Sequence, residues 1–404
     1  MIGRGVPNRL GREMVVAKAD KVLDLVQRSK LVESERLDPF LAELRAASTP
    51  EQLEDGDYLL TRLTDQGLIT RWQADRLREG RYKGFFLGKY KLLGHLGSGG
   101  MSSVYLAEHV LMRRLVAIKV LPQSRVEDTS YLARFRLEAQ AAARLDDRNI
   151  VRAYDIDNED KIHFIVMEYI DGPDLQTWIK QHGPMSFDLA ADYIAQAAMG
   201  LEHAHEAGLI HRDIKPANLL IDSKGVVKVL DMGLAKFADS DKHSLTLAYD
   251  ENVLGTADFL APEQAMNSHT VDRRADIYSL GCTLYFLLTG HAPFPEGTLP
   301  QRLMAHQTKA PQSILVDRPD APAELVAICQ RMMHKSPDKR FQSAQLVADA
   351  LRQWLAKTRA KSDPSAAPAV SPKRTTPGAT SSGASPASTP STGMPSAGQS
   401  AAGS

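Results

Sequence analysis

The feature that most constrains this chain is residues 211–231, where a polar loop is followed by two aliphatic runs and an aspartate. The runs at 219–221 and 226–230 are typical of short strands, and the Asp-Ser-Lys-Gly sequence between them favours a tight turn. The strands of such a hairpin run antiparallel, so its two outer ends come together. The sequence therefore predicts that Asn218 and Asp231 lie side by side.

The polar side chains of this loop have a shared chemistry. The oxygen atoms of Asn218 and Asp231 suit Mg²⁺, which takes few protein ligands and completes its shell with water and nucleotide phosphates. On the same loop, Asp213 can accept a hydroxyl proton and Lys215 can stabilise charge on a transferred group. Any one of these residues would also suit a polar loop capped by its own aspartates, but their fixed spacing favours phosphoryl transfer.

A glycine-rich segment lies between two predicted strands nearer the N-terminus. It consists of Gly97, Ser98, Gly99, Gly100, Met101, Ser102, Ser103 and Val104. Glycine lets backbone N–H groups approach phosphate oxygens closely and adopt positive φ. An ordinary glycine hairpin in a sheet is the alternative, and this segment alone does not distinguish the two.

The next predicted strand, at 115–120, favours the phosphate-binding alternative. Strand side chains alternate between faces, so Ala117 and Lys119 point the same way. A small residue then forms the floor of a pocket while a cation lies beside it, although Lys119 on a solvated face is the other interpretation.

Residues 129–145 are predicted to form an amphipathic helix, with Thr129 or Ser130 as its cap and Glu138 at the edge of its apolar stripe. An acid that faces inward needs a cation, and Lys119 is the natural partner. The pair would hold the lysine toward the α and β phosphates of a nucleotide. An exposed glutamate on a solvated face is the alternative.

Composition divides the chain into regions. Residues 1–87 have apolar positions three and four apart and are expected to form short helices, either as a docking or autoinhibitory module or as a stabilising extension of the next lobe. Residues 88–170 have the pattern of short strands, and residues 171–356 are mainly helical. Residues 357–404 are rich in Ser, Ala, Pro, Thr and Gly, which predicts a disordered tail.

The bulk properties exclude some classes of partner. The 49 basic and 49 acidic side chains cancel, so neither nucleic acid nor an anionic membrane is expected as the main partner. No apolar run reaches the ~18–20 residues that a membrane span needs. Cys282 and Cys329 lie in apolar helical stretches, which is typical of buried thiols in a reduced, cytoplasmic protein.

Taken in order, the motifs resemble those of the eukaryotic-like (Hanks-type) serine/threonine protein kinases. The residues within the motifs are most similar to those of bacterial members. The resemblance covers roughly residues 88–354. It rests on six motifs: the glycine-rich segment, Lys119, Glu138, the loop at 211–218, Asp231-Met232-Gly233 and Ala261-Pro262-Glu263. It implies an α+β bilobal protein kinase fold, with a β-rich small lobe (88–170) containing one key helix and a mainly α-helical large lobe (171–356).

The resemblance also implies roles for single residues. The catalytic residues would be Asp213 as the base, Lys215, and the ion pair of Lys119 with Glu138, while Asn218 and Asp231 would bind Mg²⁺, with Mn²⁺ as the alternative metal. The ATP site would combine the glycine-rich segment with Leu96, Ala117, Lys119, Met167, Glu168, Ile170, Asp174 and Leu220.

Within that site, the resemblance gives Met167 as the gatekeeper, the backbone of Glu168 and Ile170 as the adenine contact, and Asp174 as a neighbour of the ribose. Outside it, Glu263 would pair with Arg340, and Asp276 would brace the catalytic loop from below.

Two residues depart from the family pattern. Ser102 takes the place of the third glycine, and Met232 that of a phenylalanine. Serine keeps a small side chain and methionine fills an apolar slot, so altered nucleotide affinity is expected rather than its loss.

The implied activity is transfer of the γ-phosphoryl group of Mg-ATP to Ser or Thr hydroxyls of protein substrates in intracellular signalling, and Lys215 and Thr256 carry the Ser/Thr preference. Autophosphorylation is expected at Ser244 or Thr246, in a transient homodimer, with Arg212 receiving the phosphate. The rival functions are a pseudokinase scaffold and a small-molecule phosphotransferase.

Overall fold

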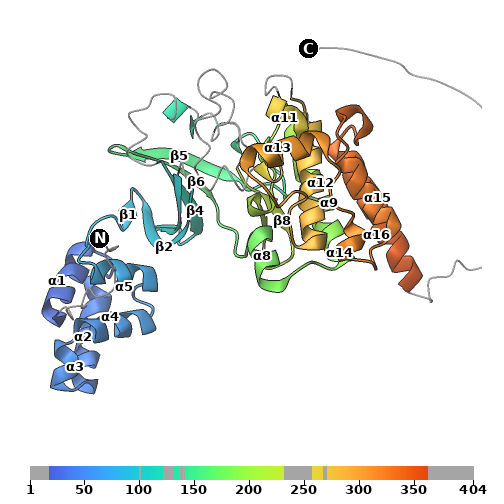
Figure 1. Cartoon of the computed structure of the whole chain (residues 1–404). Coiled ribbons are helices and arrows are strands. Elements are labelled where there is room, and N and C mark those ends of the chain that lie inside the picture. Colours follow the sequence, from blue (N-terminus) through green and yellow to red (C-terminus); the bar gives the residue numbers. More distant parts are fainter. Residues whose placement is uncertain are drawn as a thin grey trace, which may run out of the picture. The chain divides into compact units, whose positions relative to one another are not determined.

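The computed structural model describes residues 18–99, 102–121, 132–133, 135–136, 140, 142–231, 257–266 and 271–362 (Figure 1). Residues up to 359 belong to one compact unit and the remainder to a second. Within the described ranges, no helix is long and apolar enough to cross a membrane.

The described part of the chain begins at residue 18 with five helices, drawn in blue in Figure 1. They are α1 (Ala19–Ser29), α2 (Ser34–Ala47), α3 (Pro50–Glu54), α4 (Gly56–Asp65) and α5 (Arg71–Arg78). Thr49 and Thr70 begin α3 and α5 with capping boxes, which satisfy the first backbone N–H groups of each helix. The apolar faces form one core around Val26, Leu60 and Leu63, as the three- and four-residue spacing predicts. We call residues 18–85 the helical module.

A six-stranded antiparallel sheet follows, in the order β1-β2-β3-β4-β6-β5. Its strands are β1 (Phe86–Leu87), β2 (Tyr90–Gly99), β3 (Ser102–His109), β4 (Leu115–Val120), β5 (Ala153–Glu159) and β6 (Ile162–Glu168). On β4, Ala117 and Lys119 are 7% and 8% exposed, so the alternative of a solvated lysine is wrong. The burial pattern of β4 therefore agrees with a pocket that combines a small residue and a cation.

The predicted helix at 129–145 falls largely outside the described residues. Residues 132, 133, 135, 136, 140 and 142 are helical, and 143–144 form a turn. Phe135 is buried in an apolar cluster with Ala117 and Met167, as the predicted stripe requires. Glu138 is outside the described residues.

The large lobe, which follows the sheet, is mainly helical around one core (Figure 1). Its elements are α8 (Leu175–His182), α9 (Phe187–Glu206), η1 (Pro216–Asn218), β7 (Leu219–Ile221), β8 (Val227–Val229), α11 (Pro262–Met266), α12 (Arg274–Thr289), α13 (Leu299–Thr308), α14 (Ile314–Asp317), α15 (Ala323–Met332), η5 (Pro337–Lys339) and α16 (Ala344–Ser362). Helix α12 is buried along most of its length, so it forms the centre of this core.

Helices α12 and α15 pack closely at one glycine. A Cβ on Gly281 would lie 2.7 Å from the Cβ of Met332, closer than real contacts allow, so only glycine fits there. Cys282 and Cys329 are buried and free, as predicted, and burial raises the pKa of Cys282 to about 12.

Helix α16 corrects the predicted domain boundary at residue 357. The helix continues to Ser362, past the start of the predicted tail, and Lys357 pairs with Glu324 of α15 at 2.7 Å. The predicted tail beyond 362 lies outside the described residues.

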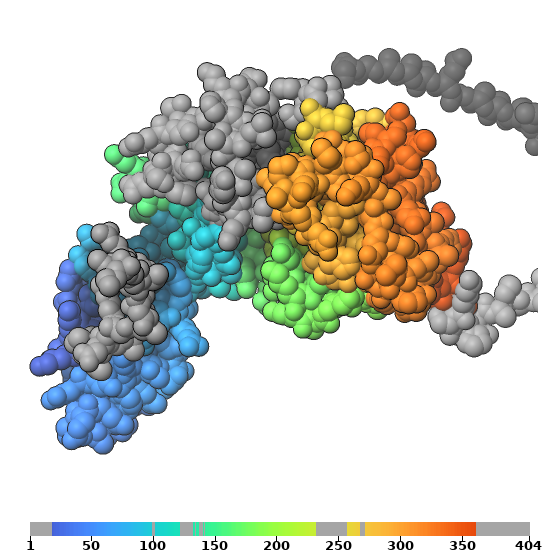
Figure 2. Space-filling view, viewed as in Figure 1, coloured from blue at the N-terminus to red at the C-terminus, as the bar shows by residue number. Residues whose placement is uncertain are grey.

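A row of hydrogen-bonded side chains inside the large lobe joins Lys335 to Tyr278 of α12 and His306 of α13. The surface of α13 is part of the orange region in Figure 2. Lys335 Nζ donates to Tyr278 Oη at 3.1 Å, and Tyr278 Oη lies 2.9 Å from His306 Nδ1. Because an ammonium group has only donors, the tyrosine O–H is left to donate to the imidazole, which must then be neutral. Burial and the nearby Lys335 charge lower the pKa of His306 to about 4.

Because the pKa of His306 is lowered, we expect the free energy of unfolding to decrease at mildly acidic pH. The folded-state pKa of about 4 lies below the ordinary value of about 6.5, so between these values the unfolded chain binds the extra proton. Lowering the pH from 7.5 to 5.5 should cost about 1.4 kcal/mol more in wild type than in His306→Gln, as measured by urea unfolding. Equal pH dependence in the two proteins would contradict the assignment.

Candidate active site

The catalytic loop predicted at 211–218 is held by one buried carboxylate. Asp276, on α12, is 0% exposed and accepts hydrogen bonds from His205 Nε2 at 2.7 Å, His211 N at 2.9 Å and Arg212 N at 2.7 Å. Burial opposes ionisation, but these donors outweigh it and hold the pKa of Asp276 below its ordinary value. Asp276 therefore braces the loop, as the family resemblance implies.

The brace holds a strained backbone. Arg212 has φ 61°, a left-handed conformation that costs free energy for a residue with a Cβ. Its N–H donates to Asp276, and its carbonyl accepts from Gln264 Nε2 at 3.0 Å. Both sides of the strained peptide are thus tied to other elements.

His211 connects the loop to the hairpin. The imidazole is fully buried, and its Nδ1 accepts from Asp213 N at 3.2 Å. The other nitrogen, Nε2, then carries the proton and donates to Leu230 O at 2.7 Å. The position of the Asp213 backbone is therefore fixed relative to the residue before Asp231.

Asp213 lies at the centre of the loop with two of its predicted partners. Lys215 Nζ donates to Asp213 Oδ2 at 3.1 Å. Asn218 Nδ2 donates to Asp213 O at 2.8 Å and to Oδ2 at 3.3 Å. The side chains of Asp213 and Lys215 are 17% and 20% exposed, so they remain accessible at a surface.

The hairpin has the register that the sequence requires. Leu219 pairs with Val229, and Leu230 N donates to Asn218 O at 2.8 Å, so Asn218 lies directly across from the residue before Asp231. The turn contains Gly225 at φ 75°, a conformation that favours glycine. Strand pairing thus brings Asn218 next to the backbone that leads to Asp231.

Lys119 and Asp231 join the two lobes of the site. Lys119 Nζ, from β4, lies 2.9 Å from Asp231 Oδ1, and the Asp231 side chain is 40% exposed. Asp231 has φ 49°, a second left-handed residue in the site. The predicted partner Glu138 is outside the described residues, so the ion pair that the structure describes is Lys119 with Asp231.

The oxygen atoms near this pair fit a divalent cation. Asn218 uses its amide nitrogen toward Asp213, which leaves its amide oxygen as an acceptor, and the Asp231 carboxylate is partly exposed. Among the described residues, no group of three or more His, Cys, Asp or Glu side chains gathers as a metal site. This donor set is the kind that Mg²⁺ uses, because Mg²⁺ keeps water and phosphate ligands.

The residues predicted around adenine are largely brought together. Ala117 pairs with Met167 across β4 and β6, and both are buried in a cluster with Ile170, against which Val104 and Leu220 pack. Among the described residues, Leu96 lies outside this cluster and is 48% exposed.

The glycine-rich segment forms the tip of the β2–β3 hairpin. Gly97 pairs with Val104, Ser98 with Ser103, and Gly99 with Ser102. Gly100 and Met101 are outside the described residues. This geometry is compatible with both a phosphate-binding segment and an ordinary glycine hairpin.

Two other predicted residues have structural contacts that the sequence did not indicate. Asp174 begins α8, where it accepts from Thr177 N at 2.8 Å and from Thr177 Oγ1 at 2.6 Å. Glu168 pairs with Lys228 Nζ at 2.8 Å, and Lys228 is 8% exposed. A lysine within the aliphatic strand β8 was the signal available for this pair.

Beyond the loop, Arg340 forms the pair predicted with Glu263. It is 1% exposed and donates to both carboxylate oxygens, at 2.6 and 2.8 Å. Its remaining donors reach the backbone oxygens of His334, Arg274 and Lys335. This guanidinium therefore ties α11 to the segment between α15 and α16.

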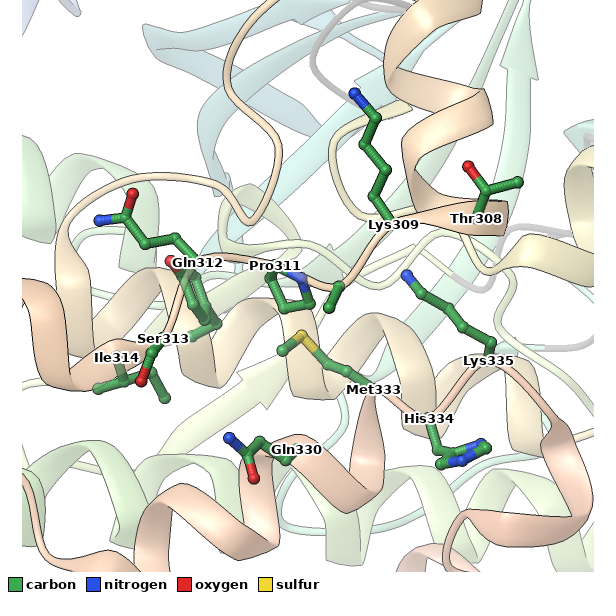
Figure 3. Close-up of a pocket in the computed structure, with 12 residues that line it drawn as sticks. Thr308, Lys309, Pro311, Gln312, Ser313, Ile314, Gln330, Met333, His334 and Lys335 are labelled. Atoms are coloured by element: carbon green, nitrogen blue, oxygen red, sulfur yellow. The ribbon is translucent and has the colours of Figure 1, made fainter.

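A separate cavity of about 450 Å³ lies in the large lobe (Figure 3). It is lined by Tyr285, the segment 308–314, Gln330 and the segment 333–335, and Figure 3 shows the Met333 side chain pointing toward Pro311. None of the residues predicted for ATP or metal lines it, so this cavity is distinct from the site above.

Comparisons with known proteins point to one family. The protein kinase domain family matches residues 90–351. Serine/threonine-protein kinase PrkC of Bacillus subtilis is 38% identical over 258 residues, which are 64% of this chain and 39% of PrkC. Serine/threonine-protein kinase PknB of Mycolicibacterium smegmatis is 40% identical over 269 residues, which are 65% of this chain and 43% of PknB.

Solved structures give the same result. The crystal structure of the Mycobacterium tuberculosis PknI kinase domain has a TM-score of 0.52 and 28% identity, and the match covers 67% of this chain and 98% of that domain. The chain spans about two fifths of the length of the curated relatives described above.

The buried guanidinium of Arg340 generates a prediction. Arg340→Lys keeps the charge but cannot make the planar, two-pronged contact with Glu263, so the carboxylate is left with unsatisfied hydrogen bonds. Unfolding stability should fall by about 3 kcal/mol. Arg352→Lys, on the exposed face of α16, is the control and should change stability by less than about 0.5 kcal/mol. Thermal unfolding measures the stability of both variants. Equal losses of stability would contradict the role given to the bidentate Arg340–Glu263 contact.

Proposed function

The chain belongs to the protein kinase family, and from this premise we propose that it transfers the γ-phosphoryl group of Mg-ATP to serine or threonine hydroxyls of proteins. The resemblance to bacterial serine/threonine kinases and the bilobal kinase fold predicted from the sequence are both confirmed. One observation carries the proposal of activity: Asp213, Lys215 and Asn218 contact one another beside the Lys119–Asp231 pair.

In the proposed reaction, Asp213 orients the substrate hydroxyl and accepts its proton as the oxygen attacks the γ-phosphorus of ATP. The bond from that phosphorus to the bridging oxygen of the β-phosphate breaks, and ADP leaves. Lys215, 3.1 Å from Asp213 Oδ2, stabilises negative charge on the transferred group. The brace from Asp276 supports these roles, because it holds the backbone on which both side chains are placed.

The nucleotide would occupy the region between the apolar cluster and the ion pair. Ala117, Met167 and Leu220 offer apolar surface to adenine, the backbone of Glu168 and Ile170 offers hydrogen bonds to its edge, and Lys119 reaches the phosphates. Asn218 and Asp231 would hold Mg²⁺, which neutralises phosphate charge when bound. Asp174 is proposed near the ribose, and residues 97–104 near the phosphates.

A protein substrate is favoured over a small molecule by the region around Glu263. Its bidentate pair with Arg340 and the Gln264 contact with Arg212 hold α11 against the catalytic loop. A rigid element at this position supports docking of an extended peptide. We propose that the enzyme acts in intracellular signalling, where ATP is available, and therefore in the cytoplasm.

The activity is tested with purified protein, Mg-ATP and a basic protein substrate. Asp213→Asn keeps the shape of the side chain but removes the base, so phosphate incorporation should fall roughly 10²- to 10⁴-fold. Asp188→Asn, on the exposed start of α9, is the matched control and should retain activity. Equal incorporation by wild type and Asp213→Asn would refute the role of Asp213. Nucleotide binding without incorporation by wild type would favour a scaffold.

We also propose autophosphorylation at Ser244 or Thr246, in a transient homodimer, with Arg212 receiving the phosphate. Both hydroxyls lie outside the described residues. Mass spectrometry after incubation with Mg-ATP should find phosphate within residues 239–250 in wild type and not in Asp213→Asn. Phosphate-free peptides from active wild type would contradict this proposal.

A further inference from the structure

The helical module is hydrogen-bonded to β2 just before the glycine-rich segment. Gln73, on α5, is 0% exposed and donates from Nε2 to Leu92 O at 2.6 Å, while its Oε1 accepts from Thr70 N at 2.9 Å. Thr70 Oγ1 donates to Leu93 O at 2.5 Å. Two consecutive carbonyl groups of β2 are therefore bound by the start of α5.

These two carbonyl groups lie where β2 is irregular. The pairing with β3 passes from Leu92–Ala107 to Gly94–Leu106, so Leu93 is an extra residue without a partner on β3. On the other side of β2, the short strand β1 pairs only with Lys91 and Tyr90. Helix α5 thus supplies a donor to each of these two carbonyl groups, which holds the bulge in its register.

An aromatic chain continues from α5 toward the phosphate-binding segment. The Trp72 ring packs edge-to-face on Tyr105 of β3, with centroids 6.0 Å apart. Tyr105 in turn packs on its cross-strand neighbour His95 at 5.3 Å. His95 Nε2 lies 2.8 Å from Ser98 Oγ, inside the glycine-rich segment. Each step is a direct contact, so the path from the module to Ser98 is continuous.

A second irregularity lies along the same path. The β2–β3 register shifts again between His95 and Gly97, immediately before the paired tip of the hairpin. Two bulges between Leu92 and Gly97 bend the strand and set the direction in which its end leaves the sheet. The first bulge is fixed by Gln73 and Thr70, and the second is flanked by the His95 contacts.

We propose that α5 is a fixed part of the nucleotide site, in which Trp72 and Gln73 are positioning residues that aim residues 97–99 and 102–104 at the ATP phosphates. This inference rests on the proposed kinase function. It selects between the two alternatives for residues 1–87: the module stabilises the small lobe and does not inhibit it. An inhibitory module would instead give higher activity when its contacts are loosened.

If α5 positions the glycine-rich segment, substitutions in α5 should change ATP binding without changing the rate of phosphoryl transfer. Asp213 and its partners are held by Asp276, in another lobe, so loosening α5 leaves them in place. Trp72→Ala and Gln73→Met should each weaken ATP binding and raise the KM for ATP about 5- to 10-fold, corresponding to the loss of one buried contact. The kcat at saturating ATP should change less than about 2-fold. His95 is exposed and lies outside the module, and His95→Ala should also weaken ATP binding and raise the KM for ATP.

Three controls distinguish positioning from general destabilisation. Trp72→Phe keeps an aromatic ring against Tyr105 and should restore most of the affinity. Leu63→Ala creates a cavity in the module core without touching β2, so it should lower the unfolding temperature but leave the KM for ATP unchanged. Arg45→Ala, on the exposed face of α2, should change neither quantity.

Binding is measured with a fluorescent ATP analogue on the full chain carrying Asp213→Asn, and KM and kcat on chains with Asp213 intact. Weaker binding in the Trp72→Ala, Gln73→Met and His95→Ala chains supports the inference, even if no protein incorporates phosphate and the proposed function fails. Unchanged affinity in His95→Ala and Gln73→Met, or a KM increase in Leu63→Ala equal to that in Trp72→Ala, overturns the inference while leaving the kinase activity standing. Higher kcat in the module variants also overturns it.

Discussion

The rest of the site depends on the buried carboxylate of Asp276. A charge at 0% exposure is costly unless donors surround it, and here three donors come from His205, His211 and Arg212. Two of these donors are backbone N–H groups of the catalytic loop. The carboxylate therefore fixes the main chain itself, and the contacts of Asp213 with His211, Lys215 and Asn218 build on that anchor.

The Lys119–Asp231 pair then connects this fixed loop to the sheet. Lys119 extends from a buried face of β4, where a cation needs a partner, and Asp231 ends the hairpin that begins after Asn218. The arrangement of a cation beside partly exposed oxygen atoms suits phosphate together with a divalent metal. One side of the site is thus set by Asp276, and the other by the strands that carry Lys119 and the glycine-rich segment.

The two sides are anchored to different parts of the chain. The catalytic loop depends on α12, in the core of the large lobe, whereas the bulged end of β2 depends on α5. This separation explains why binding and chemistry are expected to respond to different substitutions. The proposed role of α5 would give a helical module outside the matched kinase region 90–351 a part in the proposed nucleotide site.

The sequence by itself determined what acts over a few residues: the hairpin that brings Asn218 to the segment before Asp231, the shared face of Ala117 and Lys119, and the amphipathic helices. Strand alternation and turn chemistry are local, so they can be read from the chain. Motif resemblance supplied the kinase fold and the Glu263–Arg340 pair.

Only the tertiary structure decided which distant groups meet. Lys228 with Glu168 and Gln73 with Leu92 O are contacts that no local pattern encodes, because their donors could have been satisfied by water or by other neighbours. The pairing of Lys357 on α16 with Glu324 on α15 is a third such contact. Packing selects these partners, and packing exists only once the lobes are formed.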